Sequence, residues 1–142
     1  MTKQNASLDP TEAVNAAILA RLKADAELVA LVGPRIYVRP PASLPYPYVL
    51  LEAPTLGPFD TLGRYGKSYT VQLRGLSQQA GTVEALRIRS RLVALTDGHR
   101  EALAAPFRVY WLELEPSPAV YTTSEAGVVT THAPIILKVW AR

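Results

Sequence analysis

The sequence has no cysteine, no long apolar run and no dense cluster of basic residues. The absence of cysteine excludes disulfides and thiolate chemistry. No apolar run approaches the roughly 18 residues that a membrane span needs, and the first residues lack the apolar stretch of a signal peptide. The net charge of +3 over 142 residues is only mildly basic, whereas dedicated nucleic-acid-binding domains concentrate Lys and Arg on one face. We therefore expect no association with a membrane.

Patterns for catalysis or metal binding are equally scarce. The two histidines, His99 and His132, are distant in the sequence and have no cluster of acidic residues beside them, so no zinc site is predicted. Glu113 and Glu115 share one strand face, but their position near a strand end and Pro116 favours two solvent-facing carboxylates over an acid–base pair. No serine lies in a Gly-x-Ser-x-Gly turn. We expect no enzymatic activity, no metal and no cofactor.

The segment 61–68 resembles the end of a phosphate-binding loop, because it finishes in Gly-Lys-Ser. Two features argue against that function. Thr61 occupies the place of the first glycine, and an alternating strand follows where the loop requires the N-terminus of a helix to hold phosphate. We interpret the segment as a basic loop that carries Arg64 and Lys67.

Three arginines, Arg87, Arg89 and Arg91, lie on a predicted helix. Helical geometry places Arg87 and Arg91 on one side and turns Arg89 away, while Glu84 is three residues from Arg87 and can pair with it. A solvated or subunit-facing side of the helix is favoured over a phosphate-binding site. No interleaved aromatic residues indicate a stacking surface for single-stranded nucleic acid.

The composition predicts a globular protein, since 49% of the residues are apolar and 19% are charged. We expect a flexible N-terminal arm at residues 1–8 and a single α+β domain at residues 9–142. Helices are predicted where apolar residues recur every three to four positions, and strands where they alternate or cluster. Asp25 is expected to cap a short helix that Gly33 ends. The predicted helices are 9–23, 26–32 and 82–96, and the predicted strands are 35–39, 47–53, 68–76, 107–114 and 128–140, with loops at 54–67 and 122–127.

This order indicates an α+β fold: a mixed, mainly antiparallel sheet of about five strands with two main helices packed on one face. The last strand carries Ile135, Leu137 and Val139 on one side but Ile136 and Trp140 on the other. Two helices cover only one face, so we expect another subunit or a partner to cover the second. The alternative is a curved sheet that closes on its own loops.

Three short signals follow one another in the first third of the chain: a capped turn over residues 25–33, the extended Arg-Ile-Tyr at 35–37, and Tyr-Pro-Tyr-Val at 46–49. In this order they resemble the tail completion, or tail terminator, proteins of tailed bacteriophages. The resemblance continues through a strand, a helix and a terminal strand pair, and it spans about residues 12–140. Pro134 in the last strand is a departure from the family pattern. It bears on the register of that strand, because a proline favours an edge or a bulge.

The resemblance implies a structural virion protein that forms a sixfold ring at the head-proximal end of the tail tube. Such a ring ends polymerisation of the major tail tube protein and joins the tail to the head-completion protein of the capsid neck, while DNA passes through its channel without being read. It also implies a location at the head–tail junction of the virion, assembly in the host cytoplasm, and no catalytic residues. The alternatives are a head-completion or stopper protein of the neck and a small basic nucleic-acid-binding module.

Candidate contact residues follow from this expected function. Assembly should rest on sheet surfaces and edges, so the candidates for the subunit interface lie on the apolar strands: Trp111, Leu112, Leu114, Ile136 and Trp140. Contacts with the tail tube or the neck should come from loops, because loops vary freely in shape. The candidates for these contacts are Phe59, Arg64, Tyr65, Lys67, Tyr121 and Glu125.

Overall fold

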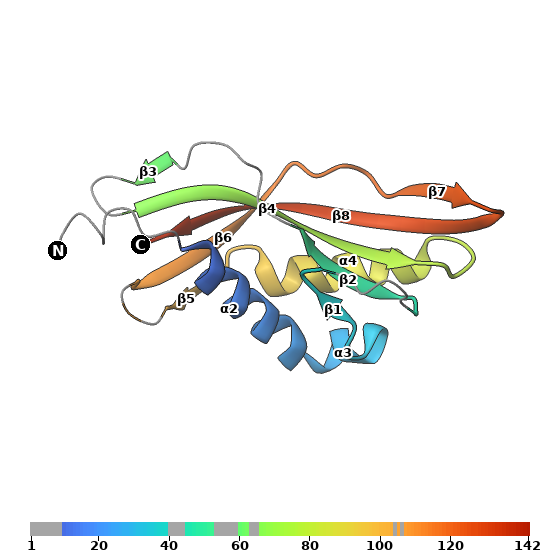
Figure 1. Ribbon diagram of the computed structural model, residues 1–142, viewed down its shortest axis with the longest axis horizontal. Helices are drawn as coiled ribbons and strands as arrows, with labels where there is room; N and C mark the ends of the chain where they lie inside the picture. Colours follow the sequence, from blue (N-terminus) through green and yellow to red (C-terminus); the bar gives the residue numbers. More distant parts are fainter. Residues whose placement is uncertain (1–9, 40–44, 53–59, 63–65, 104, 106) are drawn as a thin grey trace.

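The structure, a computed structural model, describes residues 10–39, 45–52, 60–62, 66–103, 105 and 107–142. The arm predicted for residues 1–8 lies outside this part of the chain. The helices of the described residues all lie on one face of a single sheet, which gives two layers (Figure 1). No helix among these residues is long and apolar enough to span a membrane.

Each predicted helix is present near its expected position. The helices are α2 (Thr11–Ala24), α3 (Ala26–Val32) and α4 (Val83–Thr96). α2 buries Val14, Ile18 and Leu22 at intervals of four residues, so one apolar stripe enters the core. α4 buries Ile88 and Leu92 in the same way and packs on the central strands of the sheet.

The short helix α3 is held at both ends by the two residues that the sequence indicates. The Asp25 carboxylate accepts a 2.8 Å hydrogen bond from the backbone amide of Leu28, which satisfies a donor that the helix itself leaves free. Gly33 has a φ of 62°, in the left-handed region that favours glycine, and ends the helix. Both predictions about this helix are confirmed.

The described residues form one sheet of eight strands, three more than the sequence predicts. The strands are β1 (Ile36–Tyr37), β2 (Tyr48–Glu52), β3 (Asp60–Leu62), β4 (Gly66–Ser77), β5 (Arg100–Ala102), β6 (Val109–Glu115), β7 (Tyr121–Glu125) and β8 (Val128–Ala141). Their order is β1-β2-β4-β8-β6-β5, with β3 beside β4 and β7 beside β8. β1 and β2 are parallel and the other pairs are antiparallel, so the α+β class and the mixed, mainly antiparallel sheet are confirmed while the strand number is wrong.

The sequence pattern does not predict β3, β5 or β7, because these segments are short and lack an alternating apolar pattern. Each one forms beside a longer strand that supplies its backbone partners. β7 and β8 are joined by Ala126 and Gly127, both with positive φ, as in a tight two-residue hairpin turn. The loop expected over residues 122–127 is therefore a hairpin, since β8 extends far enough to pair with β7.

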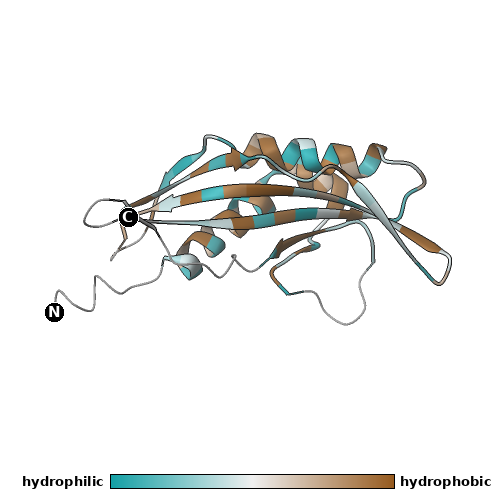
Figure 2. Ribbon diagram, turned by 90° about the horizontal axis from the view of Figure 1, so that it is seen from above, coloured by the Kyte–Doolittle hydropathy of each residue, from teal (hydrophilic) through white to brown (hydrophobic). Residues whose placement is uncertain are grey.

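The antiparallel ladder of β4 and β8 is the centre of the sheet. It runs from Lys67 opposite Ala141 to Ser77 opposite Thr131. Apolar and polar residues alternate along these strands (Figure 2), so one side of the ladder is apolar and faces the helices. The buried residues on that side include Val71, Leu73, Ile135, Leu137 and Val139.

Pro134 lies within this ladder without a bulge, and its register partner is Arg74. The amide of Ile136, two residues later, donates to Ser117 Oγ at 2.9 Å, in the gap that separates β6 from β7. Because alternate residues of a strand direct their backbone groups to the same side, the missing N–H of Pro134 faces that gap, where no strand of the described residues requires a donor. The bulge expected at Pro134 is wrong, and an edge exists only locally, at this gap.

At Gly75, α4 packs directly on the backbone of β4. A Cβ atom built at Gly75 would lie 2.6 Å from Ile88 Cγ2, which is closer than two carbon atoms approach. Ile88 is fully buried between the helix and the sheet. The absence of a side chain at Gly75 therefore sets the distance between the two layers.

Replacing Gly75 by alanine should lower the free energy of unfolding by about 1–3 kcal/mol, because the added methyl group displaces Ile88 and α4 with it. The measurement is chemical denaturation of Gly75→Ala beside the parent chain. In an Ile88→Ala background the same substitution should cost less, since the clashing methyl group is gone. An equal cost in both backgrounds would show that the contact with Ile88 is not the cause.

Candidate assembly surfaces

The sheet face opposite the helices carries two stacked tryptophans. Trp111 on β6 and Trp140 on β8 lie opposite each other, with ring centroids 6.2 Å apart and planes 11° from parallel. The Arg100 guanidinium lies 5.4 Å from the Trp111 ring centre, and the Lys138 ammonium lies 5.3 Å from that of Trp140, both within reach of a cation–π interaction. Ile136 lies on the same face of β8. We call Trp111, Ile136 and Trp140 the tryptophan face; all three are only partly buried.

The other two residues predicted for the subunit interface lie on the opposite side of β6. Leu112 is fully buried in the core beneath the helices, so this chain does not present it to a neighbouring copy. Leu114, two residues later, is 36% exposed and stays accessible. Alternation along β6 places Trp111 on one face and Leu112 and Leu114 on the other, but alternation alone does not say which face the helices cover.

The residues predicted to contact the tail or neck are only partly described. Phe59, Arg64 and Tyr65 lie outside the described residues, and Lys67 is described only through its backbone position in β4. Tyr121 and Glu125 are the first and last residues of β7, and both are exposed. They therefore lie on a regular hairpin strand and not in a loop.

A polar cluster fixes the base of the β7–β8 hairpin. The ring of Tyr121 stacks on His132, with centroids 4.6 Å apart and planes 1° from parallel. Arg74 on β4 donates from Nη1 to the Tyr121 hydroxyl at 3.1 Å, and its Nη2 pairs with Glu52 on β2. Side chains from β2, β4, β7 and β8 thus hold the hairpin in addition to its own backbone ladder.

His132 is held in the neutral form within this cluster. Its Nδ1 lies 3.4 Å from Arg74 Nη1, and because a guanidinium only donates, Nδ1 accepts. The proton of the neutral ring is then on Nε2, which donates to Thr123 Oγ1 at 2.8 Å. Burial and the positive charge of Arg74 both lower the pKa of His132. The ring therefore serves as a structural link between β4 and the hairpin.

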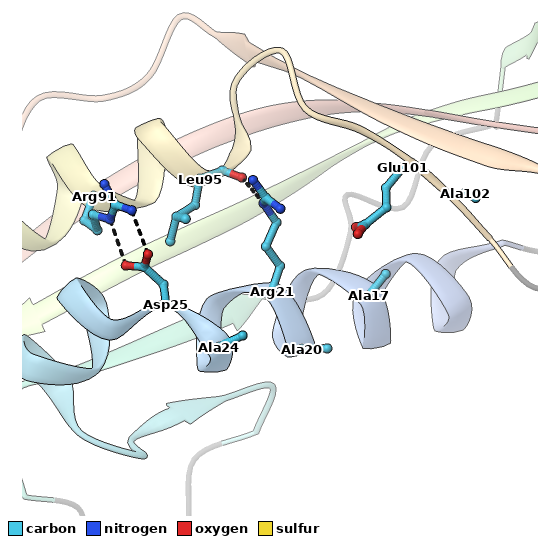
Figure 3. A pocket seen from close by; sticks show the side chains of 9 residues that line it. All are labelled: Ala17, Ala20, Arg21, Ala24, Asp25, Arg91, Leu95, Glu101 and Ala102. Atoms are coloured by element: carbon cyan, nitrogen blue, oxygen red, sulfur yellow. Dashed lines mark hydrogen bonds and ion pairs between the residues drawn. The ribbon is translucent and has the colours of Figure 1, made fainter.

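The helix side carries a pocket of about 650 Å³ between α2, α4 and β5 (Figure 3). Arg91 of α4 donates to both carboxylate oxygens of Asp25 at 2.6 and 2.7 Å. Arg21 of α2 donates from Nε to the carbonyl oxygen of Leu95 at 2.8 Å, near the end of α4. The charged groups of this pocket thus connect the first two helices to α4.

A second group of polar residues joins β5 to β6. The hydroxyl of Tyr110 donates to Glu101 Oε2 at 2.9 Å, and His99 Nε2 lies 3.3 Å from the same oxygen. Burial raises the pKa of Tyr110, and the hydrogen bond from Tyr110 is the main cause of the lowered pKa of Glu101. The phenol stays protonated and the carboxylate ionised, so the pair acts as a structural link. No group of three His, Asp or Glu side chains in the described part of the chain could hold a metal ion.

Arg87 and Arg91 lie on one side of α4, where both line a groove beside α3, and Arg89 turns away from them, as helical spacing predicts. Arg91 binds Asp25, and Arg89 donates to the carbonyl oxygen of Pro134 at 3.3 Å. Glu84 accepts a hydrogen bond from Ser77 at 2.7 Å. The pair expected between Glu84 and Arg87 is absent from the described residues, and Arg87 is exposed.

The family of tail completion protein gp17 matches residues 16–134. The chain belongs to this family. It is thus a structural protein of bacteriophage tails, and the family is one of virion structural proteins and not of enzymes. The resemblance predicted from the order of the sequence signals is confirmed. A search of curated proteins finds no match.

A solved structure shares the fold. One chain in the structure of the virion of a native gene transfer agent (GTA) particle superposes with a TM-score of 0.76. The match covers 95% of this chain and 98% of that chain, at 23% sequence identity. At this identity the comparison supports the two-layer fold over nearly the whole chain.

Asp25 both caps α3 and binds Arg91, and two substitutions separate these roles. Asp25→Asn should keep the cap and lose the ion pair, whereas Asp25→Ala should lose both. Loss of the cap alone should lower the free energy of unfolding by about 0.5–2 kcal/mol. Chemical denaturation at pH 7 should therefore rank the chains as parent, Asp25→Asn and Asp25→Ala in decreasing stability. An Asp25→Ala chain as stable as Asp25→Asn would show that the cap contributes nothing.

The pH dependence provides the control for the ion pair. The hydrogen bonds from Arg91 lower the pKa of Asp25 from 3.8 to about 2. Because the pKa is lower in the folded state, the stabilisation is complete above about pH 4 and is lost as the pH falls from about 4 to about 2. The stability difference between the parent chain and Asp25→Asn should shrink over that window. A difference that stays constant would contradict the role of the ionised carboxylate.

Proposed function

We propose that copies of this chain form a sixfold ring that caps the head-proximal end of the tail tube, ends its polymerisation and joins the tail to the capsid neck. One observation carries the proposal: in a member of the tail completion family, helices cover one face of the sheet while Trp111, Ile136 and Trp140 stay partly exposed on the other. Contiguous exposed apolar residues mark interaction surfaces. We propose that a neighbouring copy covers this face, because repeated contacts of this kind between copies generate a ring.

A closed ring requires head-to-tail contacts, because each copy presents one surface to the preceding copy and a different surface to the next one. The two layers of this fold provide two different surfaces. The first is the tryptophan face on the open side of the sheet. The second is the outer side of the helices. We propose that the sheet side of one copy meets the helix side of the next.

The further partners in this proposal are the major tail tube protein and the head-completion protein of the neck. Contacts with them are assigned to the segment 59–67, with Phe59, Arg64, Tyr65 and the β4 residue Lys67 as candidates. Tyr121 is a weaker candidate, because its ring and hydroxyl are engaged by His132 and Arg74. DNA passes through the channel of the ring without sequence-specific contacts, and the chain is located at the head–tail junction of the virion.

Nucleic-acid binding as the main function has less support. Of the three arginines on α4, Arg89 and Arg91 are engaged within the chain itself. A DNA affinity that falls steeply with salt would favour that function, because such a slope reports several phosphate contacts. Weak binding that vanishes near physiological salt would leave the ring proposal in place.

The first test is electron microscopy of lysates from infections with an amber stop in this gene. We expect headless tails of irregular and excessive length, because nothing ends polymerisation of the tube. Headless tails of normal length would assign the chain to the capsid side of the neck as a head-completion or stopper protein. Intact and infectious particles would contradict both structural roles.

The tryptophan face is tested by Trp111→Ala. Loss of a tryptophan at the centre of an interface typically costs 2 kcal/mol or more, about 30-fold in affinity. We therefore expect at least a tenfold decrease in the amount of this chain in purified tails, measured by quantitative immunoblot. The control is Glu113→Ala, on the same face of the same strand and exposed. If tails from the Trp111→Ala and Glu113→Ala variants contained equal amounts of this chain, the tryptophan face would not be the interface.

A further inference from the structure

The β7–β8 hairpin projects from the body of the chain. β8 pairs with β4 only from Thr131 onwards, so residues 128–130 have β7 as their strand partner. All five residues of β7 are exposed, and Val128 and Val129 are 48% and 52% exposed. Figures 1 and 2 show the hairpin extending past the body of the sheet. We call residues 121–130 the arm from here on; this segment is distinct from the N-terminal arm expected at residues 1–8.

The tip of the arm combines a carboxylate with an apolar side chain. Glu125 lies directly opposite Val128 in the register of the hairpin, so the two side chains point to the same face. No hydrogen bond or ion pair engages the side chain of Glu125 within the described residues. A two-stranded hairpin is only marginally stable alone in water, and the cluster around Arg74 fixes only its base. The tip is therefore a surface without a partner among the residues that the structure describes.

The outer side of the helical layer has a groove of complementary character. It lies between α3 and α4 and has a volume of about 430 Å³. Its lining includes the apolar side chains of Ala30, Leu31 and Ala94. It also includes Arg87, which is exposed and has no acidic partner in the part of the chain that the structure describes. Arg91, the other arginine of the groove, is paired with Asp25 and with Glu27, an exposed carboxylate that also lines the groove. Arg87 is therefore the arginine of the groove that is left to pair with an incoming carboxylate.

We propose that the arm of one copy docks in the α3–α4 groove of the next copy, with Val128 on the apolar lining and Glu125 paired with Arg87. This inference rests on the proposed ring. The arm belongs to the sheet layer and extends beyond α4 (Figure 1). The groove opens on the outer side of the helices, so the arm and the groove meet only between copies. Arm and groove are the two different surfaces that a head-to-tail contact requires, and they match in charge and in apolar character.

The ion pair is tested by exchanging its charges. Glu125→Arg and Arg87→Glu should each lower the yield of joined, infectious particles about tenfold or more, because like charges then meet at every contact of the ring. The double variant should recover to within about threefold of the parent, since the pair is restored in reverse. Glu12→Arg, an exposed charge reversal on α2, is the control. A double variant as defective as the two single variants combined would overturn the pairing.

Chemical cross-linking identifies the occupant of the groove. The chain has no cysteine, so Val128→Cys and Ala94→Cys introduce the only thiols of this chain. Treatment of purified particles with a short bismaleimide should give a ladder of multiples of this chain on a denaturing immunoblot, and each single-cysteine variant should give none. The absence of a ladder, or a product that joins this chain to a tail or neck protein, would overturn docking between copies. Tail length in the same double-cysteine variant tests the ring separately. If this variant still made tails of normal length but gave no ladder, the docking contact alone would be overturned and the ring would stand.

Discussion

The antiparallel pairing of β4 with β8 is the interaction on which the rest of this structure depends. The two strands bury Leu73 and Leu137 against the helices, and α4 rests on the ladder at Gly75. The shorter strands attach to its flanks, with β2 and β3 on one side and β6 and β7 on the other. A change of register by one residue would turn the apolar side of β8 toward solvent. The position of the helices, the tryptophans and the arm all follow from this one register.

The second constraint is that the helices of the described residues cover only one side of the ladder (Figure 1). β6 and β8 nevertheless carry large apolar side chains on both faces, so Leu112 is buried while Trp111 and Trp140 stack on the open face. β8 also continues past the end of β4 and forms the arm with β7. Within the described part of the chain, the apolar surface of the open face and the outer edge of β7 are therefore left without partners. This connects the fold to a function in assembly, which membership of the tail completion family supports.

Much of the fold could be predicted from the sequence, because its main elements are encoded by local patterns. Asp25 and Gly33 bound a helix whatever surrounds it, and the apolar stripe of α2 is readable from spacing alone. The short strands are different, since residues such as Thr122 and Thr123 have no apolar pattern and form a strand only because β8 lies beside them. The two-residue turn at 126–127 after a threonine-rich segment is the signal that could have revealed the hairpin.

The candidate contact residues divide in the same way. Alternation correctly places Trp111 and Leu112 on opposite faces, but only the tertiary structure shows that the helices cover Leu112. Pro134 could not be placed from the sequence, because its tolerance depends on the gap between β6 and β7 opposite its missing N–H. The groove between α3 and α4 is formed by residues about 60 positions apart, so no local pattern indicates it.

The proposed ring, in which the sheet side of one copy meets the helix side of the next, is open to a decisive measurement. A three-dimensional reconstruction of the head-proximal end of purified tails should show a closed ring of six copies, each with its tryptophan face covered by its neighbour and its arm against the neighbour's α3–α4 groove. A single copy per tail, or a ring in which the tryptophan face is open to solvent, would show that this chain does not assemble in this way.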